Sequence, residues 1–301
     1  MTAGILLAVA AVALQALGKV LYGAHLEGIS VALFVLVGAT AGLAIFQPAS
    51  GFRRPTGGLR LAAANNLWTA VGFLSFFYAL KHLPPATVAA TEIGVSLLAA
   101  VAAGSWRERA LPPVRRLAAC GGILAGCALL AGAELGSAEF STAMLLAFAA
   151  SMLAGVAAAF SATVSRGLAL AGWSPLSVLA HRFYLTIAAT AAWVLWDGAP
   201  LPGESAMLPL LAVCAVALLA PMLLMQQALR RIDALTVLIC MAAQPMLSFA
   251  FAMTAAGDAF DSLALAGVAV VTAFLALDIA GGRQPPAAAR RAGRKERAHA
   301  S

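Results

Sequence analysis

The stretch "ALKHLPPATV" (Ala79–Val88) and the stretch "ALRRIDALTV" (Ala228–Val237) repeat one pattern 149 residues apart. Both contain Ala-Leu, then a basic residue, and then Thr-Val at the same spacing. A second pair, "LLAVAAVAL" (Leu6–Leu14) and "LLAFAASML" (Leu145–Leu153), shares leucines and alanines at one register. A chance match is the alternative, because apolar helices are rich in Ala and Leu. Together the two pairs predict a chain built from two equivalent halves.

The composition excludes an ordinary soluble domain. Of the 301 residues, 62% are hydrophobic and 10% are charged, whereas soluble domains carry about 25% charged residues. The apolar segments are continuous, unlike the alternating pattern of a β-barrel strand. A helix that crosses a bilayer needs about 20 mostly apolar residues. The sequence therefore predicts an all-α polytopic membrane protein.

Clusters of Gly, Pro and charged residues divide the chain into ten apolar segments, as expected for turns. The predicted transmembrane helices cover residues 3–22, 28–47, 60–80, 86–104, 117–133, 142–165, 175–196, 207–227, 234–255 and 262–280. The start of the first segment, "MTAG", lacks the basic region of a signal peptide, so we interpret this segment as a retained helix.

The charged residues are distributed unevenly between the predicted loops. If the N-terminus is cytoplasmic and the spans alternate, 16 of the 19 basic residues fall inside. Acidic residues dominate the outer breaks, which hold Lys81 as their one base. Because basic loops favour the cytoplasm, we expect both termini inside a bacterial-type plasma (inner) membrane. The net charge of +7 then indicates membrane orientation rather than nucleic-acid binding.

Five spans in each half place the halves in opposite orientations. We therefore expect two inverted five-helix repeats, residues 1–136 and 137–282, followed by a disordered basic cytoplasmic tail at 283–301. Inverted repeats commonly bind a substrate between them near the midplane and alternate access by rocking.

The ten-span plan, the two quoted turns and "HRFYLTIAA" (His181–Ala189) resemble the EamA-like group of the drug/metabolite transporter (DMT) superfamily over about residues 3–280. The run "EIGV" (Glu92–Val95) is similar to the aromatic amino-acid exporter branch, which is YddG-like. Pro245 fits the family's proline in the ninth helix, but the fourth span lacks one. The resemblance implies amino-acid export, with helices one to four and six to nine around the cavity and helices five and ten outside.

Ionisable residues inside the spans are functional candidates, because each costs about 2.5–3.5 kcal/mol to insert. Glu92 lies in the fourth span with Ser96 one turn further on the same face. Glu92 either contacts a substrate ammonium group, or is protonated during coupling, or is a structural carboxyl. In the first span, Gln15 and Lys19 have the same spacing. Lys19 either pairs with Glu92 or extends to the outer surface.

The third span carries a stripe of Asn65, Trp68 and Phe76 at helical spacing, with Tyr78 near its outer end. An apolar pocket with a few polar groups suits a neutral or aromatic ligand. Ordinary packing is the alternative for the stripe, and a membrane-interface aromatic is the alternative for Tyr78.

The ninth span carries Thr236, Cys240, Gln244 and Ser248 at four-residue steps, and we expect this face to look inward, either to line a cavity or to bind neighbouring helices. In the seventh span, His181 and Arg182 either contact a substrate carboxylate or pair and extend to the surface. The other three cysteines predict buried small residues without metal or disulfide chemistry. Gly122-x-x-x-Gly126 predicts close helix packing.

Two other function classes were weighed. A membrane enzyme would need a catalytic motif, and the sequence contains no H-E-x-x-H, G-x-S-x-G or P-loop pattern. A carrier of phosphorylated substrates such as nucleotide-sugars would need basic residues in its cavity, for which the candidates are Lys19 and Arg182. We therefore expect a secondary transporter, not an enzyme, that moves an amino-acid-like solute without ATP, metal or cofactor. Its oligomeric state stays open, and a monomer would suffice.

Overall fold

The computed structural model of the chain is all-helical over the residues that it describes. These are residues 2–25, 29–52, 57–83, 85–109, 111–135, 141–198, 200, 202–256 and 262–281. Six described segments are long and apolar enough to cross a membrane, and Thr2–Gly18 and Leu265–Phe274 are shorter apolar helices. The chain is thus a multi-pass membrane protein.

Each predicted span corresponds to one helical rod. Six rods are single helices at the start of the chain, one is a single helix at its end, and the three between them are interrupted. The elements are α1 (Thr2–His25), α2 (Val31–Ala49), α3 (Leu59–Leu80), α4 (Pro85–Glu108), α5 (Val114–Leu135), α6 (Thr142–Leu170), α7 (Pro175–Ala180), α8 (Tyr184–Asp197), α9 (Glu204–Cys214), the π-helical turn η1 (Ala215–Leu219), α10 (Ala220–Leu229), α11 (Ala234–Met241), α12 (Gln244–Ala256) and α13 (Ser262–Gly281).

Two of the interruptions follow from proline. Pro221 and Pro245 each stand second in a helix, α10 and α12. A proline cannot donate to the carbonyl four residues before it, and its ring crowds that carbonyl. The chain widens into η1 just before Pro221, and it turns at residues 242–243 just before Gln244 and Pro245. Pro245, which fits the family's proline in the ninth helix, thus stands directly after the break in that span.

The seventh span is interrupted without a proline at the break. Its chain leaves helical geometry at residues 181–183, between α7 and α8, which frees backbone groups that a bilayer cannot hydrate. Asn66 of α3 satisfies two of them. Its Nδ2 donates to the carbonyl of His181, and its Oδ1 accepts from the backbone N–H of Leu185 at 3.3 Å.

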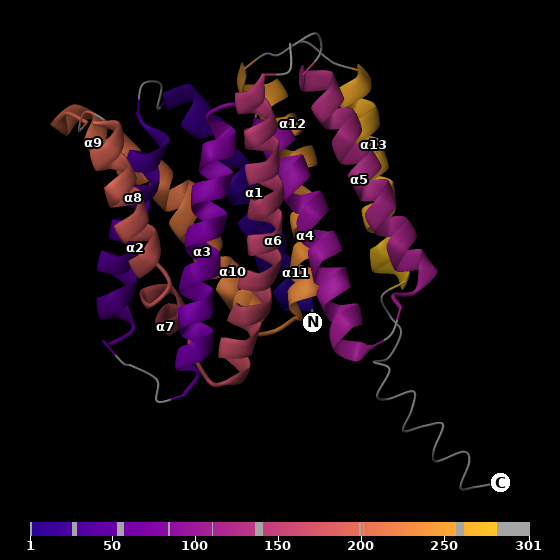
Figure 1. The fold of residues 1–301 in the computed structure, drawn as a ribbon, viewed down its shortest axis with the longest axis horizontal. Coiled ribbons are helices and arrows are strands. Elements are labelled where there is room, and N and C mark those ends of the chain that lie inside the picture. Colours follow the sequence, from indigo (N-terminus) through magenta and orange to yellow (C-terminus); the bar gives the residue numbers. More distant parts are fainter. Residues whose placement is uncertain are drawn as a thin grey trace, which may run out of the picture.

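Consecutive rods run in opposite directions, from the N-terminal end of α1 at the lower face of Figure 1 to the lower end of α13. The two repeated stretches both connect rods, and they do so at the same register. The first leaves α3 at Leu80 and enters α4 at Pro85, and the second leaves α10 at Leu229 and enters α11 at Ala234. Figure 1 shows the α3–α4 connection at the upper face and the α10–α11 connection at the lower face.

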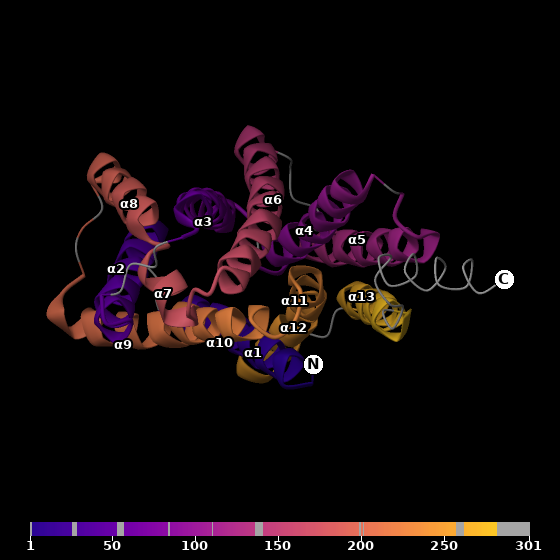
Figure 2. The ribbon, with the colours of Figure 1, turned by 90° about the horizontal axis from the view of Figure 1, so that it is seen from below.

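A similar pattern of contacts between rods occurs in both halves of the chain. The first rod, α1, packs on α10 and η1, and also on α11 and α12. The sixth rod, α6, packs in a corresponding way on α3 and on α4. The fifth and last rods, α5 and α13, pack mainly on each other, and they lie together at one end of the bundle, away from α2 and α8 (Figures 1 and 2).

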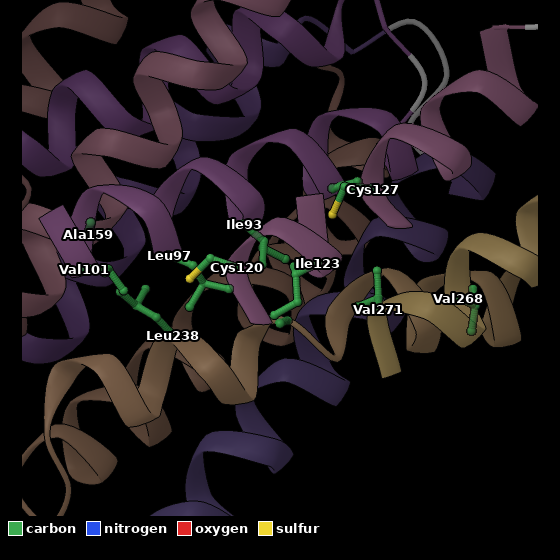
Figure 3. Close-up of a cluster of buried hydrophobic side chains, with 12 residues drawn as sticks. Ile93, Leu97, Val101, Cys120, Ile123, Cys127, Ala159, Leu238, Val268 and Val271 are labelled. Carbon is green, nitrogen blue, oxygen red and sulfur yellow. The ribbon is translucent and has the colours of Figure 1, made fainter. Parts of the chain in front are cut away.

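A cluster of buried side chains joins α5 and α13 to the rest of the bundle. Ile93 and Leu97 of α4 meet Ile123 of α5, Leu238 of α11 and Val271 of α13 (Figure 3). Gly122 and Gly126 face α13 so closely that an added Cβ would lie 2.1 Å from the Phe274 ring and 2.9 Å from the carbonyl of Gly267, respectively. The prediction of close packing at Gly122-x-x-x-Gly126 is confirmed.

The contact between α5 and α13 predicts that alanine substitutions at two glycines of α5 differ in their effect on stability. Gly126→Ala should destabilise the protein by about 1–3 kcal/mol, because its Cβ meets backbone atoms that cannot move aside. Gly121→Ala is the matched control, since nothing lies within 4 Å of its added Cβ. Thermal unfolding of both variants in detergent measures the difference, and equal melting temperatures would contradict the close contact.

The hydrogen bonds of Asn66 predict that the break in the seventh span depends on this one side chain. Asn66→Leu should cost about 1–3 kcal/mol of stability, because the carbonyl of His181 and the N–H of Leu185 lose their partner. Thr163→Val serves as a control, since Thr163 is exposed and bonds only within α6. If Asn66→Leu and Thr163→Val have the same melting temperature, other groups replace the amide and Asn66 does not stabilise the break.

Candidate functional site

A cavity of about 320 Å³ lies inside the bundle. Its described walls come from α1, α2, α3, α4 and α6, from the break between α7 and α8, and from η1, α11 and α12. No described residue of α5 or α13 lines it, in agreement with the arrangement that the resemblance implies. Six residues that the sequence singles out meet at this cavity, namely Gln15, Trp68, Phe76, Glu92, Arg182 and Gln244.

Aromatic rings form one side of the cavity. Phe73, Phe76 and Phe77 of α3 line it together with Trp68 and with Phe34 of α2. The ring of Phe76 meets that of Phe77 edge-on at 5.2 Å between centroids, and Phe34 lies 5.8 Å from Phe77. These rings provide an apolar wall for a solute of modest size.

Trp68 is held in place from behind. It stacks on Phe160 of α6, with centroids 4.8 Å apart and an interplanar angle of 16°. Phe160 does not line the cavity, whereas Trp68 does. The indole therefore presents its remaining surface to the cavity in a fixed orientation.

Two amide side chains lie on the cavity wall without partners in the described part of the chain. Gln15 comes from α1, and the buried Gln244 begins α12 at the break in the ninth span. An amide offers both donors and an acceptor, so these two groups can bind a polar solute of either kind. Glu92 of α4 adds a carboxyl group to the same wall.

Small residues make room for the cavity and for the rods around it. Gly18 of α1 lines the cavity and contacts η1, where an added Cβ would lie 2.4 Å from the Cα of Ala217. Ala154 and Ala157 of α6 supply part of the opposite wall. A larger side chain at Gly18 would push η1 away from α1.

Arg182 lines the cavity from the break in the seventh span, with 8% of its surface exposed. Its Nε and Nη2 both donate to Thr69 Oγ1, at 3.2 and 3.1 Å. Nη2 also donates to Ser161 Oγ at 3.1 Å. Both partners are neutral, and within the described residues the guanidinium has no carboxylate partner. Two helices thus fix the orientation of this cation without neutralising it.

The hydrogen bonds around Arg182 continue away from the cavity. Ser161 Oγ donates to Asn65 Oδ1 at 3.2 Å, and Ser165 Oγ donates to the same oxygen at 3.1 Å. The amide Nε2 of Gln226 donates to Ser165 Oγ at 3.2 Å. This chain of buried polar groups links α3, α6 and α10 directly beside the cavity.

Several residues predicted to bind substrate do not line the cavity. Tyr78 packs in the cluster around Leu83 and Ala147, with its ring 5.1 Å from that of His82. Asn65 is buried among hydroxyl groups, as described above. Ser96 bonds the carbonyl of Ile93 at 2.9 Å and lies where α4 contacts α6. Helical spacing from Glu92 therefore does not carry Ser96 to the cavity, because α6 covers that part of the face.

His181 and Thr236 are also placed elsewhere. His181 Nδ1 lies 3.0 Å from the carbonyl of Ser177, and its ring contacts Trp173 and Tyr184 edge-on. Thr236 bonds Asp233, the N-cap residue of α11, through its backbone N–H and its hydroxyl. The side chain of Lys19 lies outside the described part of the structure.

Three residues of the predicted polar face of the ninth span, Cys240, Gln244 and Ser248, are buried, as expected for a face that looks inward. Gln244 lines the cavity, but Cys240 packs in the cluster of Ala8, Leu229 and Val237. Ser248 is buried with no hydrogen-bond partner in the described chain. Within the described residues, Gln244 is the member of this face that lines the cavity. All four cysteines are buried, as predicted for Cys120, Cys127 and Cys214.

Sequence reasoning missed the residues that surround Arg182. Thr69 and Ser161 are single hydroxyl residues in apolar helices, and nothing in their sequence neighbourhood marks them. Phe73 and Phe77 lie beside the predicted stripe on α3, and a wider helical face would have placed them in the predicted site. Gln226, a buried amide in an apolar span, is the one signal that a search for intramembrane polar residues would have found.

Comparison with known proteins agrees with this architecture. A solved crystal structure whose description names no function superposes with a TM-score of 0.74 at 19% sequence identity, over 92% of this chain and 96% of that one. At this identity the likeness concerns the fold alone. No curated protein matches the chain. Residues 142–277 match the model of the EamA-like transporter family, so the second half of the chain is similar to membrane transporters of the DMT type.

Proposed function

We propose that this protein is a secondary transporter that exports small metabolites, above all neutral and aromatic amino acids. The observation that carries the proposal is the cavity inside the bundle, which combines an aromatic wall with the side chains of Gln15, Gln244, Glu92 and Arg182. Such a site, apolar with a few polar groups, suits a small amphiphilic solute. The match of the second half to EamA-like transporters supports the transport class.

The mechanism we propose is alternating access between two inverted repeats, residues 1–136 and 137–282. Two observations support it. The repeated turns end and begin helices at the same register on opposite faces of the bundle. The contacts of α1 with the third and fourth rods of the second half correspond to those of α6 with α3 and α4. Rocking of one repeat against the other would open the cavity to one side at a time.

The size and the polarity of the cavity favour a small solute over a nucleotide-sugar. A volume of about 320 Å³ stands at the lower end of the range for small-molecule sites, about 300–1,000 Å³. Arg182 is its one described basic residue, whereas a diphosphate would call for several. A membrane enzyme has no support in a catalytic motif, and no group of residues suited to bind a metal occurs in the described ranges.

We further propose that both termini face the cytoplasm of a bacterial-type inner membrane. The face that carries the N-terminal end of α1 also carries the α4–α5 and α10–α11 connections, which hold Arg109, Arg230 and Arg231. Basic residues retain loops on the cytoplasmic side. The basic tail at 283–301 would then lie beside anionic headgroups.

This orientation predicts the outcome of reporter fusions. Fusions after Arg109 and after Arg283 should be active in the cytoplasm, and fusions near Glu139 and Asp258 should be external, because the rods alternate in direction. Enzyme reporters specific for each compartment measure this. A cytoplasmic signal near Glu139 would contradict the alternating order and with it the inverted repeats.

Transport itself is tested with purified protein in vesicles. Labelled phenylalanine or tryptophan should cross without ATP, and Trp68→Ala should slow these substrates at least several-fold more than alanine or threonine, since the ring loses its apolar partner. Trp196→Ala is the matched control, because Trp196 is 89% exposed and distant from the cavity lining. Absence of amino-acid flux would refute the substrate class, and equal losses for all substrates would assign Trp68 to packing.

The same vesicles test Glu92. A sequence without an ATP-binding motif indicates transport driven by a gradient, either of protons or of the solute itself, and we propose Glu92 as the group that contacts a substrate ammonium or exchanges a proton. Glu92→Gln keeps the size of the side chain and removes its charge. Unchanged flux and gradient dependence in this variant would reduce Glu92 to a structural role.

A further inference from the structure

We infer that Arg182 is the anchor for a carboxylate group on the transported solute. The inference rests on the proposed transport function and goes beyond it, because it names the charge that the solute must carry. It stands on three features of the structure, namely the charge of Arg182, its donors without a partner in the described residues and the way in which its position is fixed.

The first feature is a buried cation without a counter-charge. A guanidinium stays protonated in proteins, and an unpaired charge removed from water is costly. Arg182 is almost fully buried, and its hydrogen bonds within the described chain go to the hydroxyls of Thr69 and Ser161. Neither hydroxyl can neutralise the charge. The carboxyl group of Glu92 lies on the same cavity but forms no ion pair with Arg182 among the described residues, so a ligand in the cavity can supply the missing negative charge.

The second feature is that hydrogen bonds within the described chain involve only part of the guanidinium. The N–H groups of Nε and Nη2 are directed at Thr69 and Ser161. The two N–H groups on Nη1 have no partner in the described residues. Because Nε and Nη2 are fixed by α3 and α6, Nη1 is the part of Arg182 available to a solute. Charge-assisted hydrogen bonds from such a group to a carboxylate are about twice as strong as neutral ones.

The third feature is a rigid mounting. Arg182 belongs to the break between α7 and α8, and Asn66 bonds the backbone on both sides of it, at His181 and Leu185. The hydroxyl of Ser161 is in turn oriented by Asn65, which also accepts from Ser165. A charged group held in this way binds an anion without ordering its own side chain first, which lowers the entropic cost of binding.

The rest of the cavity selects which anion binds. Most of its lining is aromatic or small and apolar, with Gln15, Glu92 and Gln244 as polar groups, so it suits an organic solute with an apolar body better than a strongly hydrated phosphate. The aromatic wall and Arg182 lie on the same cavity, and Trp68 and Thr69 are neighbours on α3. We therefore assign the carboxylate of an arylalkyl acid, including that of an aromatic amino acid, to Arg182.

Binding to the purified full-length protein in detergent tests this assignment directly. The probes are phenylalanine and 3-phenylpropionate, which carry a carboxylate, and phenylalaninamide, which does not. Titration calorimetry should give the wild-type protein an affinity at least about tenfold higher for the acids than for the amide, the effect of one charge-assisted hydrogen bond. Arg182→Gln should remove this preference by weakening the acids alone, and Arg182→Lys should restore part of it.

One control and two further variants complete this experiment. Arg166→Gln removes a guanidinium of α6 that bonds the carbonyl of Leu229 and does not line the cavity, so the preference for acids should persist. Thr69→Val and Ser161→Ala retain Arg182 but remove the groups that orient it, and each should lower the affinity for the acids by several-fold. These two variants carry the test if Arg182→Gln fails to fold.

The outcomes separate this inference from the proposed function. Equal binding of acids and amide by the wild-type protein, or an acid preference that survives Arg182→Gln, overturns the assignment of Arg182 even if vesicles transport amino acids. Preference for phenyl phosphate over 3-phenylpropionate overturns the choice of carboxylate. Binding of the acids through Arg182 without any flux in vesicles refutes the proposed transport function and leaves the anion site standing.

Discussion

The architecture depends on one constraint of the bilayer, which offers no water to unpaired backbone N–H and C=O groups. Continuous helices satisfy this constraint within each segment, and α1–α6 and α13 do so. An interruption is tolerated only where protein or a polar cavity supplies partners. In this protein the three interrupted rods follow one another in the second half, and each contributes to the cavity. Arg182 comes from the first break, Ala217 and Leu218 come from η1, and Met241 and Gln244 flank the last break.

The interrupted rods and the continuous helices contribute different features to the cavity. The interrupted rods bring irregular backbone and polar side chains to the cavity, while α3 contributes a regular face with Trp68, Gly72 and Phe76. Asn66 connects the two, because it lies on α3 and bonds the backbone beside Arg182. A change in the position of α3 would therefore move the aromatic wall and the break in the seventh span together.

Outside this centre, the packing of α5 against α13 relies on close contact rather than on polar groups. Lipid tails are as apolar as leucine, so helices associate in membranes through shape and small residues. Gly122 and Gly126 let α13 approach to van der Waals distance. The same principle operates at Gly18, where α1 meets η1 beside the cavity. The helices around the cavity are thereby brought close together at the centre, while α5 and α13 form a separate pair at the end of the bundle.

The sequence by itself determined the membrane class, the number and order of the rods, and the turns at Leu80 and Leu229, because hydrophobic length and turn chemistry act over short stretches. It also indicated six residues of the cavity. It could not exclude Tyr78, Ser96 and Thr236 from the cavity lining, because a helical stripe does not tell which neighbour covers each turn. Only the tertiary structure decided that Arg182 meets Thr69, 113 residues away in the chain, since that contact depends on how α3, α6 and the interrupted seventh span cross. Local sequence carries no information about such a crossing.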